Sequence, residues 1–111
     1  MTEQEILARH GLVTVAQAML DGELPYLEGA AQVLAIRSQL SGIADRDADF
    51  DVFVVIRSET DHLPLEEQRY LWPPEVLARL EPEFKQSEEW ARSFAPQACR
   101  HLIERFNNTK T

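Results

Sequence analysis

The residues whose types could do chemistry are concentrated in one short stretch of the chain, residues 57–64. His62 is a candidate general base, and Asp61 or Glu59 is a candidate to orient its imidazole ring. Ser58 is a candidate nucleophile that such a base would activate. This combination of residue types is the one used in acyl-transfer and hydrolytic chemistry.

The same stretch has a structural explanation. Asp61 or His62 stands just before Leu63-Pro64-Leu65-Glu66, a pattern typical of a helix start, where a polar side chain accepts backbone N–H groups. One backbone rarely aims adjacent side chains at a common point. We therefore interpret the stretch as a helix cap and an ordered loop, and we predict no catalytic residue.

Arg57 and His62 share the Arg-x4-His spacing, and in this they resemble the HEPN ribonucleases. The resemblance implies a helical fold in which Arg57 and His62 lie at the start of a helix and act on an RNA phosphate across a dimer interface. The acidic residues around the pair would repel RNA. A small HEPN-like ribonuclease is therefore an alternative function rather than the main hypothesis.

Alternating aspartates in residues 45–51 have the oxygen ligands of a calcium loop. The EF-hand loop needs Gly at its sixth position and Glu at its twelfth, and this chain has Phe50 and Ile56 there. We predict a solvated acidic loop and no metal site. The sequence also contains none of the motifs that hold a phosphate, a nucleotide or zinc, so we predict no cofactor.

Charge is the strongest feature of the chain as a whole. Its 19 acidic and 11 basic residues give a formal net charge of −8. Residues 45–89 contain 13 of the acidic residues and only five basic ones, so this middle region accounts for the entire net charge. Such a surface attracts basic partners and disfavours direct contact with nucleic acid. The simpler explanation is that the charge keeps the protein soluble.

We predict that the middle region binds a basic protein. Trp72 precedes two prolines and is the aromatic residue that we expect at the surface, whereas Trp90, Phe84 and Phe94 are expected in the core. The predicted binding residues are Asp45, Asp47, Asp49, Asp51, Glu59, Asp61, His62, Glu66, Glu67 and Trp72.

Hydrophobic periodicity predicts an all-α fold: a single-domain bundle, residues 1–111, of about five helices. Thr2 opens the first helix, Gly29 marks a close helix crossing, and Pro96 kinks the last helix or splits it; of these two we predict the kink. Residues 50–56 are rich in β-branched side chains and are compatible with a strand, but their apolar spacing favours a helix. Pro82 is expected to restart a helix.

The compartment is predicted from what the chain does not contain. Cys99, the one cysteine, has no partner for a disulfide within the chain, which is typical of a reducing environment. No apolar stretch approaches the roughly 20 residues that span a bilayer. We therefore expect a cytoplasmic protein with no membrane association and a buried, unreactive thiol.

Several stretches of the chain are similar to a group of small uncharacterised bacterial proteins: LEGA at 27–30, SETDHLP at 58–64, Trp72, and ACR at 98–100. This resemblance implies no catalytic residue. In size and acidity the chain also resembles bacterial immunity proteins. The main functional hypothesis is therefore a non-enzymatic immunity or inhibitor protein that neutralises a basic toxin, such as a nuclease, by direct binding. A homo-oligomeric structural protein is a further alternative.

Overall fold

A computed structural model describes residues 1–107 of the chain. In this part the protein is all-helical, as predicted, with five α-helices and one short 3-10 helix. The helices are α1 (Glu3–Leu20), α2 (Tyr26–Arg37), α3 (Ala48–Thr60), the 3-10 helix η1 (Glu66–Leu71), α4 (Pro74–Arg92) and α5 (Ala95–Phe106).

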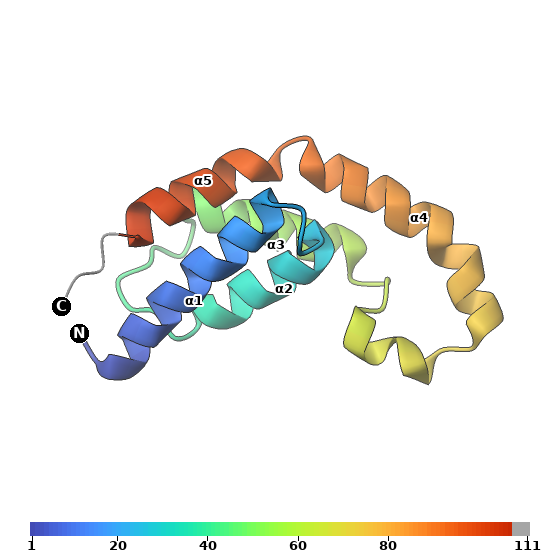
Figure 1. Ribbon diagram of the computed structural model, residues 1–111, viewed down its shortest axis with the longest axis horizontal. Coiled ribbons are helices and arrows are strands. Elements are labelled where there is room, and N and C mark those ends of the chain that lie inside the picture. The colour runs from blue at the N-terminus through green and yellow to red at the C-terminus, as the bar shows by residue number, and fades with distance from the viewer. Residues whose placement is uncertain (108–111) are drawn as a thin grey trace.

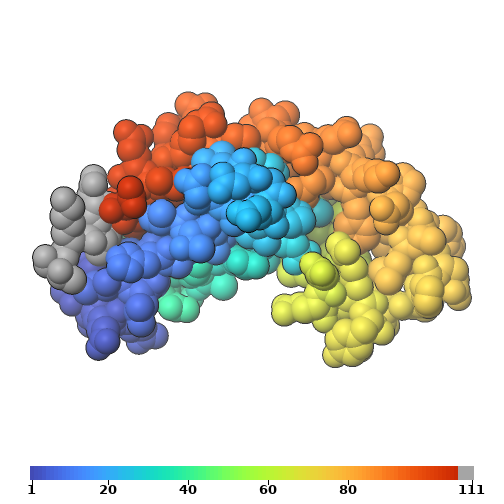
Figure 2. Space-filling model, in the orientation of Figure 1, coloured from blue at the N-terminus to red at the C-terminus, as the bar shows by residue number. Residues whose placement is uncertain are grey.

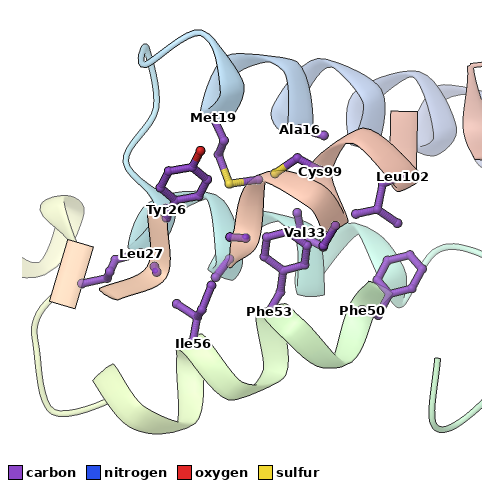
Figure 3. Packing of buried hydrophobic residues seen from close by; sticks show 14 of the residues in the cluster. Ala16, Met19, Tyr26, Leu27, Val33, Phe50, Phe53, Ile56, Cys99 and Leu102 are labelled. Atoms are coloured by element: carbon purple, nitrogen blue, oxygen red, sulfur yellow. The ribbon is translucent and has the colours of Figure 1, made fainter. Parts of the chain in front are cut away.

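Four helices form the body of the molecule. α1 packs against α5 and α2, and α3 packs against α2 and α5 (Figure 1). Their facing sides meet in one hydrophobic core, and Phe50, Phe53 and Ile56 of α3 are fully buried in it (Figure 3). Residues 50–56 therefore lie in a helix and not in a strand. The spacing of these three residues places them on one helix face, and Val54 and Val55 are on the exposed side.

The crossing of α1 and α2 is as close as the sequence predicts. A Cβ atom on Gly29 would lie only 2.2 Å from the Met19 sulfur. Only a residue without a side chain allows this approach, which brings Met19 into the core beside Tyr26. The turn before α2 contains Gly22, whose φ of 77° lies in the left-handed region that glycine adopts at little cost.

Three glutamates tie the helices together, because their carboxylates accept long-range hydrogen bonds. The Glu88 carboxylate accepts the N–H groups of Tyr26 and Leu27, and so caps α2, whose preceding residue, Pro25, has no side-chain oxygen. The Glu28 carboxylate accepts the N–H of Glu66 at 3.0 Å and so holds the start of η1. The third glutamate, Glu5, joins the start of α1 to Ser41 in the loop after α2.

In that contact the Glu5 carboxylate accepts the backbone N–H and the hydroxyl of Ser41, at 2.8 and 2.6 Å. These two hydrogen bonds lower the pKa of Glu5. Thr2 caps α1 as predicted, by accepting the N–H of Glu5 at 3.1 Å.

η1 and the first part of α4 form an arm that extends from the body. Ala91 is the only fully buried residue of α4, and the described chain measures 50 × 27 × 26 Å. Its radius of gyration is 14.8 Å, compared with about 13 Å for a compact domain of this length. Figure 2 shows the resulting hollow between the body and η1. The Arg69 guanidinium lies 4.5 Å from the centre of the Phe84 ring and closes the inner side of the arm.

The predictions of a helix restart at Pro82 and of a kink at Pro96 are wrong, whereas the alternative that the last helix is split near Pro96 is confirmed. Pro82 does not restart a helix, because α4 continues through it. Both Pro82 and Ala78, whose carbonyl loses its usual N–H partner, are exposed, so water can take the place of the missing donor. Pro96 does not kink one long helix either: the helix ends at Arg92, and Pro96 lies in the first turn of α5, where its missing N–H costs nothing.

Candidate binding surface

The acidic segment 45–51 is bound to α5. Arg105 donates two hydrogen bonds of 2.9 Å to the two oxygens of Asp47 and one of 2.9 Å to Asp49. His101 Nδ1 lies 3.0 Å from the other Asp49 oxygen. Asp47 also accepts the N–H groups of Asp49 and Phe50, so it is the N-cap of α3.

The environment of Asp47 favours its ionised form. The hydrogen bond from Arg105 lowers the pKa of Asp47, and Asp47 in turn raises the pKa of Arg105. The side chains of Asp47 and Asp49 are only 13% and 17% exposed. Their oxygens are therefore already used within the chain, in what we call the α3–α5 clamp: Asp47, Asp49, His101 and Arg105.

The other two aspartates of this segment lie closer to solvent. Asp51 accepts a hydrogen bond of 3.2 Å from Arg46, whose side chain is 88% exposed. Asp45 is exposed, and its backbone carbonyl accepts a hydrogen bond from Arg37. Of the four aspartates in residues 45–51, Asp45 is thus the one whose carboxylate has no hydrogen bond or ion pair to the described residues.

The residues with catalytic potential lie at the end of α3. Arg57 is in the last turn of α3, and its Nη1 atom is buried without a hydrogen-bond partner among residues 1–107. His62 follows the helix, and its imidazole contacts the Glu83 carboxylate of α4. The HEPN resemblance implies that the pair lies at the start of a helix, whereas here it lies at the end of one.

The capping role expected of Asp61 or His62 is not observed. η1 begins after Leu65, and neither Asp61 nor His62 accepts a hydrogen bond from the first N–H groups of η1. Glu28 supplies that acceptor from α2, 38 positions earlier in the chain. Ser58 and Asp61 are both exposed.

A groove with a volume of about 740 Å³ lies between the end of α3 and α4. Glu59 of α3 and Glu83 of α4 line it with acidic side chains, and Arg79 adds one basic side chain. Trp90 lines the same groove and is 38% exposed, so the prediction that it lies in the core is wrong. An apolar ring beside carboxylates suits a Lys or Arg side chain, which has an apolar stem and a cationic end.

The acidic charge of the arm has few basic counterparts. Residues 59–89 hold nine acidic and three basic residues, a formal charge of −6. Glu83 contacts His62 and Glu88 caps α2, but Glu59, Glu66 and Glu67 have no side-chain ion pair with any described residue. Trp72 is 37% exposed, in agreement with its predicted place at the surface.

Sequence reasoning identified part of this surface. It included Glu59, Asp61 and His62, but it missed Glu83 and Trp90, which α4 brings to them across more than 20 positions. It also missed the clamp, although His101 and Arg105 are four positions apart and so share one face of a helix. Two basic residues on one helix face could have indicated a contact with two acidic side chains elsewhere in the same chain.

The described residues contain no group of three or more histidine, cysteine or acidic side chains placed to hold a metal ion. Over the same part of the chain, no helix is long and apolar enough to cross a membrane. Cys99 is fully buried, and burial raises the pKa of its thiol to about 12. A thiol in that state is not a nucleophile at neutral pH.

Together the fold and this surface define a small all-α protein with an acidic arm. The chain belongs to a family described as a protein of unknown function (DUF2489), which matches residues 2–102. This agrees with the resemblance to an uncharacterised family and gives no support to the likeness to immunity proteins. Among curated proteins and solved structures, no match to the chain was found.

Proposed function

We propose that the protein is a non-enzymatic binding protein whose acidic arm holds a basic protein partner. The observation that carries this proposal is that some acidic side chains have partners within the fold, whereas others have none. The carboxylates of Asp47 and Asp49 are engaged within the chain by Arg105 and His101. Residues 59–89, which run from the end of α3 through η1 and most of α4, have in contrast a formal charge of −6.

The α3–α4 groove is the place where this charge meets an apolar surface. Glu59, which has no ion pair with the described residues, would pair with a lysine or arginine side chain of the partner. Glu83, which contacts His62, would add a second carboxylate to the groove, and Trp90 would cover the apolar stem of the bound side chain. The residual charge of the arm would speed the encounter. Arg79 repels cations at one wall of the groove. The proposal therefore favours a partner whose basic residues approach from the side of Glu59.

The test is capture of a partner by the immobilised protein from a lysate of the cells that produce it. We expect the wild type to retain a basic protein that is released by salt. The attraction between exposed charges extends over about 8 Å at physiological ionic strength and over a shorter distance when salt is added. The variant Glu59→Gln/Glu83→Gln should lose it, and Trp90→Ala should weaken its retention.

The matched control is Glu3→Gln/Glu23→Gln, which removes the same amount of charge from exposed positions in the body of the molecule. This control should retain the partner. No retained basic protein, or equal retention by the groove and control variants, would show that the groove is not the binding site.

The identity of the partner is a finer proposal. A toxin that this protein neutralises is the class that its size and acidity favour. Once the captured protein is identified, co-expression with it should protect cells if it is a toxin, and Glu59→Gln/Glu83→Gln should remove the protection. The ribonuclease role of Arg57 and His62 and a purely structural role stay hypotheses.

A further inference from the structure

The end of η1 exposes three consecutive apolar or aromatic side chains. Tyr70 is 82% exposed, Leu71 is 68% exposed and Trp72 is 37% exposed. We call these three residues the tip. Single exposed apolar residues are ordinary, but three in sequence at the end of an arm form the kind of aromatic anchor that dominates protein interfaces.

The body of the protein holds the tip in place. The Glu28 carboxylate fixes the first N–H of η1, and Arg69 donates a hydrogen bond of 3.4 Å to the Pro64 carbonyl while it covers Phe84. The tip therefore lies on an ordered support, at the opposite end of the molecule from the start of α1 and the end of α5 (Figure 1). Such an arrangement lowers the entropy lost when the tip binds another surface.

A second groove, with a volume of about 470 Å³, lies where the α1–α2 turn meets the junction of α4 and α5. Its apolar lining includes Leu20, Leu24 and Pro96. Arg92 and Arg100 also line it, and neither forms an ion pair with any residue in the described range. The carboxylate that lines this groove belongs to Glu88, which is occupied in capping α2. We call this the basic groove.

We propose that the tip of one copy of the chain docks in the basic groove of a second copy, and that the two copies do this reciprocally. Charge complementarity selects this occupant: the exposed Glu66 and Glu67 form the first turn of η1, one turn before the tip, and Arg92 and Arg100 line the groove. Two reciprocal contacts close a two-fold dimer and leave no tip free. This inference goes beyond the proposed function, because it uses neither Glu59 nor Glu83.

Salt dependence cannot test this dimer, because salt screens the local attraction and also the repulsion between two chains of net charge −8. Variants in which the charge of the tip or of the groove is reversed can test it at a fixed ionic strength. In the tip variant, Glu66→Arg/Glu67→Arg, both docking surfaces are basic. In the groove variant, Arg92→Glu/Arg100→Glu, both are acidic. Each variant should therefore be monomeric in sedimentation velocity over a hundredfold concentration range in which the wild type dimerises.

An equimolar mixture of the two variants should dimerise again. The basic tip of one variant then meets the acidic groove of the other, and the wild-type tip meets the wild-type groove. This recovery also shows that both variants are folded, because an unfolded chain would not restore assembly.

The apolar part of the contact is tested separately. Tyr70→Ser/Leu71→Ser should raise the dissociation constant at least about tenfold, as loss of a central anchor does. Leu7→Ser, at a residue that is 65% exposed on α1, is the control and should leave the constant unchanged.

Three results would overturn the proposal: a wild type that stays at the monomer mass of 12.7 kDa, a dimer that survives both charge variants, or a mixture that stays monomeric. Glu59→Gln/Glu83→Gln should dimerise like the wild type. Loss of partner capture and loss of self-association are therefore separate outcomes.

Discussion

Removal of the Arg105 guanidinium tests the α3–α5 clamp directly. Arg105→Ala deletes three hydrogen bonds of 2.9 Å to Asp47 and Asp49. A hydrogen bond to a charged group contributes about 1.5–3 kcal/mol, whereas an exposed ion pair contributes about 0–1 kcal/mol. The Arg105 side chain is 36% exposed, so solvent screening reduces the sum, and we expect a loss of about 2 kcal/mol of unfolding free energy.

The assay is urea unfolding followed by far-ultraviolet circular dichroism, with a thermal melt in which Tm should fall by about 8 °C. Arg46→Ala is the matched control, because Arg46 also pairs with an aspartate of the same segment but is 88% exposed. That variant should lose less than about 0.5 kcal/mol. If Arg105→Ala and Arg46→Ala are equally stable, the clamp contributes no more than a surface ion pair.

The pH dependence of this difference follows from Asp47. Arg105 lowers the pKa of Asp47 in the folded state, so the unfolded chain binds more protons at acidic pH. The advantage of the wild type over Arg105→Ala is therefore complete above the unfolded aspartate pKa of about 3.9 and is lost as the pH falls toward the lower, folded value. A difference that grows on acidification would contradict this assignment.

Two further predictions concern the core. Gly29→Ala should destabilise the fold by about 1–3 kcal/mol, because its Cβ would meet the Met19 sulfur at 2.2 Å, and this outweighs a gain of about 1 kcal/mol in helix propensity. In a Met19→Ala background the same change should stabilise instead, so thermal melts of the four proteins measure the contact, and a gain in both backgrounds would disprove it. Cys99, with a pKa of about 12, should react with a thiol reagent near pH 8 only in denaturant. A native reaction rate close to that of a free thiol would show that Cys99 is accessible.

The sequence predicts the helices well where periodicity and burial agree. In α3 the β-branched residues Val54 and Val55 favour a strand locally, but Phe50, Phe53 and Ile56 repeat at helical spacing and enter the core. Tertiary packing therefore decided the outcome against local propensity. Pro96 shows the limit of the same reasoning, since a proline near a helix boundary fits either a kink or a new first turn.

The candidate site was only partly predictable, because its contacts join distant parts of the chain. Arg105 reaches Asp47 across 58 positions, and Glu83 reaches His62 across 21. Composition revealed that the middle of the chain is acidic. It could not reveal which carboxylates have partners within the chain, since that depends on how α5 and α4 pack.

The fold thus separates the charge of the molecule between an acidic arm and a nearly neutral body, which the amino-acid composition does not show. Residues 59–89 carry −6 of the net charge of −8, so the remainder of the chain is close to neutral. Two basic side chains, Arg92 and Arg100, lie at the root of the arm. A basic partner would therefore be oriented toward the arm during its approach as well as attracted by it. The arm can keep this charge because it contributes little to the core: η1 has no buried residue, and Ala91, the one buried residue of α4, lies at the end of α4 that joins the body.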